Sequence, residues 1–296
     1  AEADGASVST RLRVASAQYP IGYFRSWDEY RLHVESWTDD AVRAGATLLL
    51  WPEYAAMELA SLFDERTQQD LQAQLSALQT VLPDFRSLFS ALAARHGIHL
   101  QPGTIPVLQP DGAFRNRAFL FGPEGELGFQ DKLQMTRFES EQWFIQAGDD
   151  VRVFDTALGK VAISTCYDSE FPLIARKQVE LGATLILVPS CTDTLAGYHR
   201  VRIGCQARAL ENQCYVVQAA TVGEAAWSPA VDENTGAAAF YGPVDRGFPA
   251  DGVLAMGELN QPGWVYADLD LTAIETVRAS GQVLNHRDWE KQKRLV

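Results

Sequence analysis

The chain of 296 residues lacks the features that mark several protein classes. It has four cysteines, too few for a disulfide-stabilised scaffold of this length, and no C-x-x-C or H-E-x-x-H motif of a zinc site. It also lacks a Gly-rich phosphate loop. No apolar stretch approaches the roughly 20 residues that a transmembrane helix needs. We therefore expect no metal, no cofactor and no membrane span.

Positive charge is also scarce. The chain has 25 Lys and Arg residues against 38 Asp and Glu residues, a net charge of −13, and no run of five basic residues. Nucleic acids and anionic membranes bind basic surfaces, so neither is an expected partner. The first five residues are polar and acidic, unlike a secretory signal. We predict a disordered lead-in over residues 1–10 and a cytoplasmic location.

Short apolar runs rich in β-branched residues alternate with segments of helical periodicity, a pattern typical of α/β proteins. Hairpins are predicted over 115–131, with the turn at 122–125, and over 252–269. The predicted strands are 12–17, 46–51, 98–102, 160–165, 183–189 and 214–221, and the predicted helices are 27–43, 68–96 (interrupted at Pro83), 173–181 and 201–212. The strand–helix–strand pattern of the first half returns in the second, which predicts one domain of two similar halves.

Three reactive side chains each follow a predicted strand. Glu53 follows TLLLWP, Lys132 follows LGFQD, and Cys166 follows KVAIST. Functional groups of open α/β sheets gather at the carboxyl ends of strands. We therefore expect these three residues to converge in space, although they are far apart in the sequence.

Cys166 lies where a strand turns into a helix, a setting that can hold a nucleophile on a sharp turn with backbone N–H groups nearby. The alternative is a small buried apolar residue, which is the interpretation we give to Cys191, Cys205 and Cys214. A catalytic thiol needs a base, and His199 is a rival partner for Cys166.

Several short segments occur together along the chain. In order, they are Leu50-Trp51-Pro52-Glu53, Asp131-Lys132, Cys166-Tyr167-Asp168-Ser169-Glu170-Phe171-Pro172, Arg208-Ala209-Leu210-Glu211-Asn212 (an R-A-x-E-N pattern), Asp251-Gly252-Val253-Leu254-Ala255 and Ala267-Asp268-Leu269-Asp270-Leu271. Together they resemble the nitrilase superfamily of carbon–nitrogen hydrolases, with its Glu-Lys-Cys signature, and the resemblance covers residues 11–272.

The resemblance implies a four-layer αββα sandwich of two similar halves. Residues 11–272 would form a single hydrolase domain, and 273–296 a C-terminal tail that packs on a partner subunit. Members of the superfamily commonly pair through a helical face, so we expect a homo-oligomer, a dimer or higher.

The chemistry of the three residues agrees with this resemblance. Glu53 can act as general base, Cys166 as nucleophile, and Lys132 with the backbone N–H of Tyr167 as stabiliser of the oxyanion. The superfamily also has a second glutamate near the site. Glu139 matches that pattern better than the alternative, Glu141.

The sequence Cys166-Tyr167-Asp168 resembles the amidase branches more than true nitrilases. It implies a small-molecule substrate, either a linear amide or an N-carbamoyl compound, cleaved through a thioester with release of ammonia or amine. Two alternatives stay open: a true nitrilase that forms acid and ammonia, and a catalytically silent binding protein on the same scaffold.

Overall fold

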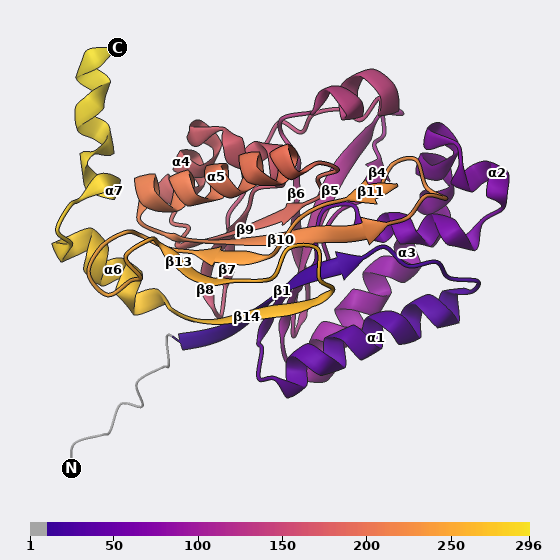
Figure 1. Ribbon diagram of the computed structural model, residues 1–296, viewed down its shortest axis with the longest axis horizontal. Helices are drawn as coiled ribbons and strands as arrows, with labels where there is room; N and C mark the ends of the chain where they lie inside the picture. Colours follow the sequence, from indigo (N-terminus) through magenta and orange to yellow (C-terminus); the bar gives the residue numbers. More distant parts are fainter. Residues whose placement is uncertain (1–10) are drawn as a thin grey trace.

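The computed structural model describes residues 11–296, and the predicted lead-in over 1–10 lies outside this range. Strand pairing joins 14 strands into one curled network. Helices cover both of its faces, with α4 and α5 on one side and α1 and α3 on the other (Figure 1). The prediction of an αββα fold is confirmed.

The strands are β1 (Arg11–Pro20), β2 (Leu48–Leu50), β3 (His99–Gln101), β4 (Ile105–Leu108), β5 (Phe114–Gly122), β6 (Gly125–Asp131), β7 (Phe154–Thr156), β8 (Gly159–Ile163), β9 (Leu185–Ser190), β10 (Tyr215–Glu224), β11 (Glu233–Asn234), β12 (Ala239–Tyr241), β13 (Val253–Met256) and β14 (Gly263–Asp270). The helices are α1 (Trp27–Arg43), α2 (Glu65–Gln68), α3 (Leu71–His96), α4 (Pro172–Glu180), α5 (Leu195–Asn212), α6 (Leu271–Ser280) and α7 (Asn285–Asp288), with the shorter turns η1 (Ala55–Leu62), η2 (Phe138–Trp143), η3 (Cys166–Glu170) and η4 (Trp289–Leu295).

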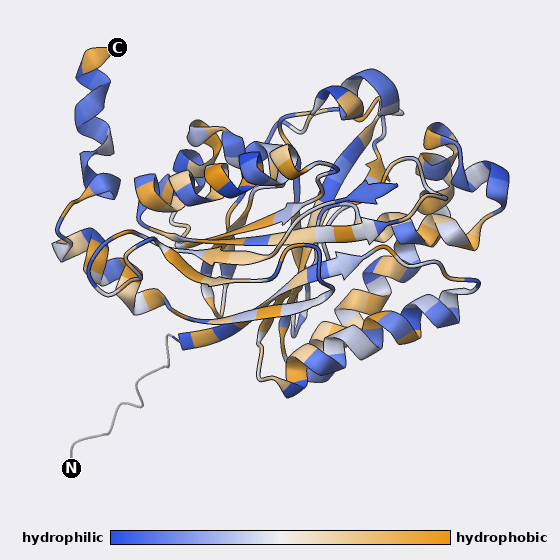
Figure 2. Ribbon diagram, in the orientation of Figure 1, coloured by the Kyte–Doolittle hydropathy of each residue, from blue (hydrophilic) through white to orange (hydrophobic). Residues whose placement is uncertain are grey.

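The layers follow from side chains that alternate along strands buried on both faces. In β9, Leu185 and Leu187 face the strands of the other half, whereas Ile186 and Val188 pack toward α4 and α5. In β2, Leu49 packs toward α1 and α3. Residues 11–296 therefore form three apolar cores, one between the two layers of strands and one beneath each pair of helices. Figure 2 shows the resulting apolar strands between helices of mixed hydropathy.

The two halves meet at β1. The strand order is β4-β5-β3-β2-β1-β10-β9-β8-β7, so the halves join where β1 and β10 run parallel through residues 18–20 of β1. Strand β14 returns antiparallel along most of β1, from Arg11 opposite Asp270 to Gln18 opposite Gly263. This arrangement brings the carboxyl ends of β2, β6 and β8 toward one another.

Two local predictions are wrong. Helix α3 continues through Pro83, which lies on the exposed face, where water can bind the carbonyl left free by the missing N–H. Strands β13 and β14 do not form a hairpin: β13 pairs with β12 and β14 pairs with β1. The hairpin of β5 and β6 is confirmed.

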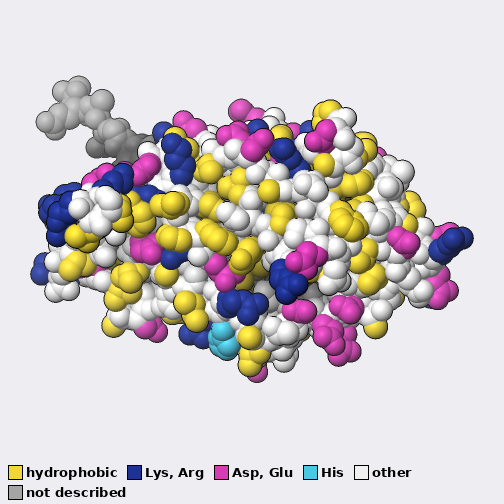
Figure 3. All heavy atoms as spheres, turned by 90° about the horizontal axis from the view of Figure 1, so that it is seen from above, with side chains coloured by type: hydrophobic (Ala, Val, Ile, Leu, Met, Phe, Trp, Pro, Cys, Tyr) yellow, Lys and Arg dark blue, Asp and Glu magenta, His cyan; other side chains and the backbone are white. Residues whose placement is uncertain are grey.

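The C-terminal elements α7 and η4 project as an arm from the body (Figure 1). Apolar side chains are scattered among charged ones on the face above α4 and α5 (Figure 3), where Leu173 and Ile203 are exposed. Pairing of subunits through a helical face and the C-terminal tail stays a prediction. Over residues 11–296, no helix is long and apolar enough to cross a membrane.

Candidate active site

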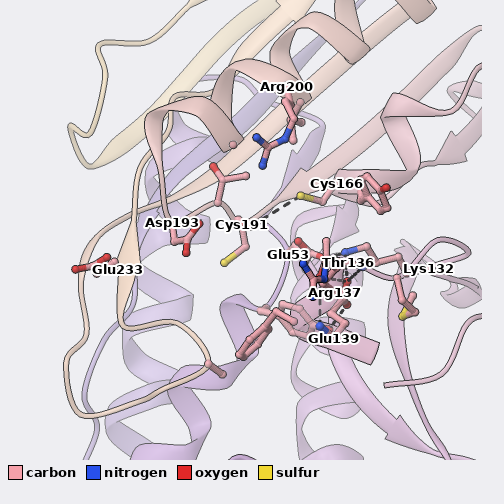
Figure 4. Close-up of a pocket in the computed structure, with 18 of the residues that line it drawn as sticks. Glu53, Lys132, Thr136, Arg137, Glu139, Cys166, Cys191, Asp193, Arg200 and Glu233 are labelled. Atoms are coloured by element: carbon pink, nitrogen blue, oxygen red, sulfur yellow. Dashed lines mark hydrogen bonds and ion pairs between the residues drawn. The ribbon is translucent and has the colours of Figure 1, made fainter. Parts of the chain in front are cut away.

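The three residues predicted from strand ends lie together in the structure. Glu53 follows β2, Lys132 follows β6 directly, and Cys166 begins η3 just after β8. All three side chains are at least 96% buried. They line one cavity of about 660 Å³ (Figure 4). The three side chains therefore converge in space at the ends of these strands, as we expected from the sequence.

Lys132 forms the centre of a buried ionic cluster. Its Nζ atom lies 2.7 Å from Oε2 of Glu53 and 2.5 Å from Oε1 of Glu139, on the turn η2. Glu141, on the same turn, is exposed and contacts Arg137 at 3.0 Å. Of the two glutamates proposed from the sequence, Glu139 reaches the cluster and Glu141 does not.

Two residues that sequence reasoning missed complete the cluster. Tyr54 donates its hydroxyl proton to Oε2 of Glu139 at 2.5 Å. Asn116 donates from Nδ2 to Oε2 of Glu53 at 2.9 Å and to Oε2 of Glu139 at 3.2 Å. Tyr54 adjoins Glu53 in the sequence, which is a weak signal, whereas Asn116 lies within β5 and carries no signal.

Cys166 has a strained backbone that sets it apart from the other cysteines. Its φ is +48°, in the left-handed region that residues with a Cβ rarely occupy. The adjoining turn packs tightly on α5, because a Cβ at Gly204 would lie 2.9 Å from the carbonyl oxygen of Ser169. Sγ of Cys166 lies 3.8 Å from the carbonyl oxygen of Cys191. This is the geometry of a nucleophile held on a sharp turn.

Asp168 connects the nucleophile turn to the lysine. Its buried carboxylate accepts N–H bonds from Gln134 at 2.7 Å and from Leu133 at 3.0 Å. Those two residues directly follow Lys132 in the chain. Asp168 therefore fixes the relative placement of Lys132 and Cys166.

The electrostatics favour a neutral thiol beside a charged lysine. Burial, followed by the charge of Glu53, raises the pKa of Cys166 well above its ordinary value. Burial lowers the pKa of Lys132, but the carboxylates of Glu139 and Glu53 outweigh it and hold that pKa well above the usual range. Cys166 therefore needs a base to lose its proton.

The two carboxylates differ in the number of their donors. Burial raises the pKa of Glu53, although Lys132 opposes it. Glu139 is equally buried, yet its pKa is lowered by Lys132 and by hydrogen bonds from Tyr54 and Thr136. Glu53 is thus the carboxylate more ready to take up a proton.

The remaining candidates divide into residues that line the cavity and residues that do not. Tyr167 lines the cavity, and the oxyanion role of its backbone N–H stays a prediction. His199 is exposed on α5 and is not among the residues that line the cavity, so the structure does not support a Cys166–His199 pair. Cys205 and Cys214 are fully buried, but the assignment of Cys191 to the core is wrong, because Cys191 is partly exposed and lines the cavity.

The outer cavity is charged. Arg200 of α5 and Glu170 of η3 line it and lie 3.9 Å apart. Asp193 and Glu233 also line it (Figure 4). Within residues 11–296, no three His, Cys, Asp or Glu side chains are arranged to hold a metal ion.

Comparisons with known proteins identify the family of the chain. The sequence model of the carbon-nitrogen hydrolase family matches residues 13–279. The chain is 34% identical over 277 residues to the probable hydrolase YhcX of Bacillus subtilis, covering 94% of this chain and 53% of that protein. It thus spans about half the length of that relative. It is 30% identical over 200 residues to omega-amidase NIT2-B of Xenopus laevis, covering 64% of this chain and 68% of the relative.

Solved structures share the fold. Nit3 of Saccharomyces cerevisiae, a member of branch 10 of the nitrilase superfamily, superposes with a TM-score of 0.70 at 21% identity, covering 91% of this chain and 93% of that one. The carbon-nitrogen hydrolase of Helicobacter pylori G27 gives 0.74 at 18% identity, covering 91% and 92%. The chain belongs to the carbon-nitrogen hydrolase family and has the nitrilase-superfamily fold.

Proposed function

We propose that this protein is a cysteine-dependent amidohydrolase that cleaves small linear amides or N-carbamoyl compounds through a thioester. The observation that carries the proposal is the joint placement of Glu53, Lys132 and the strained Cys166 in one cavity. A catalytically silent protein would have no need to bury two carboxylates and an ammonium group beside a strained thiol, because isolated buried charges are costly.

The first half of the reaction forms the acyl-enzyme. Glu53 takes the thiol proton while Sγ of Cys166 attacks the carbonyl carbon, which forms the C–S bond and places a negative charge on the carbonyl oxygen. Lys132 and the Tyr167 N–H stabilise that oxygen. Glu53 then gives the proton to the amide nitrogen, the C–N bond breaks, and ammonia or an amine leaves.

The second half releases the acid. Glu53 removes a proton from a water molecule, whose oxygen attacks the thioester carbon. The C–S bond breaks, the carboxylic acid leaves, and the proton returns to the thiolate of Cys166. The base acts in both halves, which agrees with its raised pKa.

The similarity to omega-amidase and to the deaminated glutathione amidase of Yersinia enterocolitica, 28% identical over 207 residues, supports amides as the substrate class. The cavity of about 660 Å³ is of a size that accommodates small molecules.

Ammonia release from a panel of small amides, N-carbamoyl compounds and nitriles tests the proposal. We expect turnover of amides or carbamoyl compounds and its loss in Cys166→Ala, while Cys205→Ala, at a buried core cysteine, keeps it. Full ammonia release by Cys166→Ala would refute the proposal. Turnover of nitriles but not amides would establish a nitrilase instead, and loss of activity in His199→Ala but not in Lys132→Ala would support a Cys–His hydrolase.

A further inference from the structure

Asn116 contacts three members of the proposed catalytic cluster. Its side-chain Nδ2 donates to Glu53 at 2.9 Å and to Glu139 at 3.2 Å. Its backbone carbonyl accepts the N–H of Lys132 at 2.9 Å. The residue is fully buried in β5. A single side-chain amide therefore uses both of its N–H bonds on the two carboxylates that flank the lysine.

The orientation of this amide is fixed by its neighbours. A flipped amide would point its oxygen at two carboxylates, so Nδ2 must face them. Within residues 11–296, Oδ1 of Asn116 is buried without a protein partner. A buried acceptor without a partner costs free energy, so the placement of this amide depends on the two bonds that Nδ2 donates to the carboxylates.

Asn116 and Lys132 also share one oxygen of Glu53. Both donate to Oε2, at 2.9 Å and 2.7 Å. In the described contacts neither of them donates to Oε1, which leaves that oxygen for the proton of Cys166. We propose that Asn116 is a positioning residue of the hydrolytic reaction, which holds Glu53 in its ionised, base-competent form and turns one carboxylate oxygen to the nucleophile.

The proposal concerns a group with several titratable neighbours. Glu53 faces Lys132 at the end of β6, Glu139 on η2 and Cys166 on η3, and Tyr54 adjoins it. Cys191, after β9, lies on the same cavity. Lys132 is the cation of this set, and Asn116 adds an uncharged donor to the base. Loss of that donor favours the protonated form of Glu53 and raises its pKa.

The inference rests on the proposed amidase function, and the pH profile of kcat/KM tests it. The variant Asn116→Leu keeps the volume of the side chain, excludes water and removes both N–H donors. We expect the acid limb to move to higher pH by about one to two units, because the loss of one hydrogen bond to a charged group typically shifts the pKa of that group by this amount. kcat near neutral pH should fall about tenfold or more, with a smaller change in KM.

Asn212 provides a matched control. It is likewise buried, its Nδ2 donates to the carbonyl of Arg208 at 3.0 Å, and its Oδ1 has no protein partner in the described chain. This side-chain hydrogen bond of Asn212 goes to a backbone carbonyl and to none of Glu53, Lys132 and Glu139. Asn212→Leu should therefore lower stability without moving the acid limb, whereas a merely structural role for Asn116 would make the two variants behave alike.

A second variant keeps the role of Asn116 testable if Asn116→Leu folds poorly. Asn116→Asp keeps the shape and the backbone bond to Lys132 but adds a carboxylate to the cluster. Its acid limb should move further upward than that of Asn116→Leu, since like charges favour protonation. The rate of alkylation of Cys166 by iodoacetamide, followed by mass spectrometry across pH, should shift in the same direction and does not depend on the substrate.

The outcomes separate the two proposals. Ammonia release by Cys166→Ala would refute the amidase function itself. With that activity lost as expected, an unshifted acid limb and an unshifted alkylation profile in either folded Asn116 variant would overturn the role of Asn116. If both Asn116 variants fail to fold while Asn212→Leu folds, a structural role accounts for Asn116 and the inference is likewise overturned.

Discussion

The carboxylate of Glu139 contacts the ammonium group of Lys132 at 2.5 Å, although the two residues come from different elements, η2 and the end of β6. Glu141 lies two residues further along and points to the surface, where it pairs with Arg137. We predict that Glu139→Gln lowers kcat/KM about 100-fold or more, because it removes a buried charge that holds Lys132.

Glu141→Gln is the matched control, since it makes the same chemical change on the same turn. Its steady-state kinetics should stay close to wild type, because an exposed ion pair is worth about 1 kcal/mol or less. Equal losses of activity in both variants would contradict the assignment of Glu139 to the cluster.

Asp168 offers a test of how the nucleophile turn is held against Lys132. Both carboxylate oxygens of Asp168 accept N–H bonds from Leu133 and Gln134, and Asp168→Asn replaces one of these oxygens with an amide NH2 that cannot accept, so the two segments should separate. We predict a loss of kcat of about 10- to 100-fold, since small misplacements of reacting groups are costly. Asp155→Asn, at an exposed position of β7, should leave kcat unchanged.

The same variant makes a prediction about stability and pH. Burial raises the pKa of Asp168 from 3.8 to about 7. The folded protein therefore holds this proton more tightly than the unfolded chain, so the stabilisation is present below about pH 4 and is lost as pH rises through about 7.

Urea unfolding at about pH 5 and about pH 8 measures this effect. Wild type should lose more unfolding free energy than Asp168→Asn over that interval, by a few kcal/mol at about 1.4 kcal/mol per pH unit. An equal or larger loss in Asp168→Asn would show that the carboxyl does not titrate in this range.

Gly103 tests how the base is placed. Its φ is +73°, and a Cβ at this position would overlap the carbonyl oxygen of Pro52, the residue before Glu53. We predict that Gly103→Ala displaces Glu53 and lowers kcat/KM about 100-fold. Gly112 has a comparable φ of +88°, but a Cβ there would meet no neighbouring atom. Gly112→Ala therefore introduces the same kind of backbone strain without displacing Glu53. Equal kinetic effects of the two variants would contradict the prediction.

Burial in the core between the two layers of strands should contribute strongly to stability. Leu187 is fully buried there, whereas Leu173 at the start of α4 is 72% exposed. Leu187→Ala should lower the free energy of unfolding by about 2–5 kcal/mol, and Leu173→Ala by less than about 0.5 kcal/mol. Chemical denaturation checks both, and similar values would contradict the layered packing.

The sequence predicts the parts of this site that follow from regular structure. Glu53, Lys132 and Cys166 each come after an apolar run, and strand ends converge by a general rule of α/β sheets. The residues of β9 are all buried, and its side chains alternate between two cores, which follows from strand geometry in the same way.

The rest depends on contacts that no local pattern encodes. Asn116 lies inside a strand, and its neighbours Glu53 and Glu139 are 63 and 23 residues away. Glu139 and Glu141 share a short turn whose irregular π-helical geometry decides which of them faces inward. The pairing of β14 with β1 joins the two ends of the domain, and local turn signals favour a hairpin instead.

The central claim is that Cys166 forms a thioester with the acyl group of an amide. Rapid quenching of the enzyme with a substrate amide, followed by peptide mass spectrometry, measures this directly. We predict that the acyl mass appears on the peptide that contains Cys166, and that Glu53→Gln and Cys166→Ala abolish ammonia release. Steady turnover of the amide with no acyl mass on Cys166, and with activity retained in Cys166→Ala, would contradict the account.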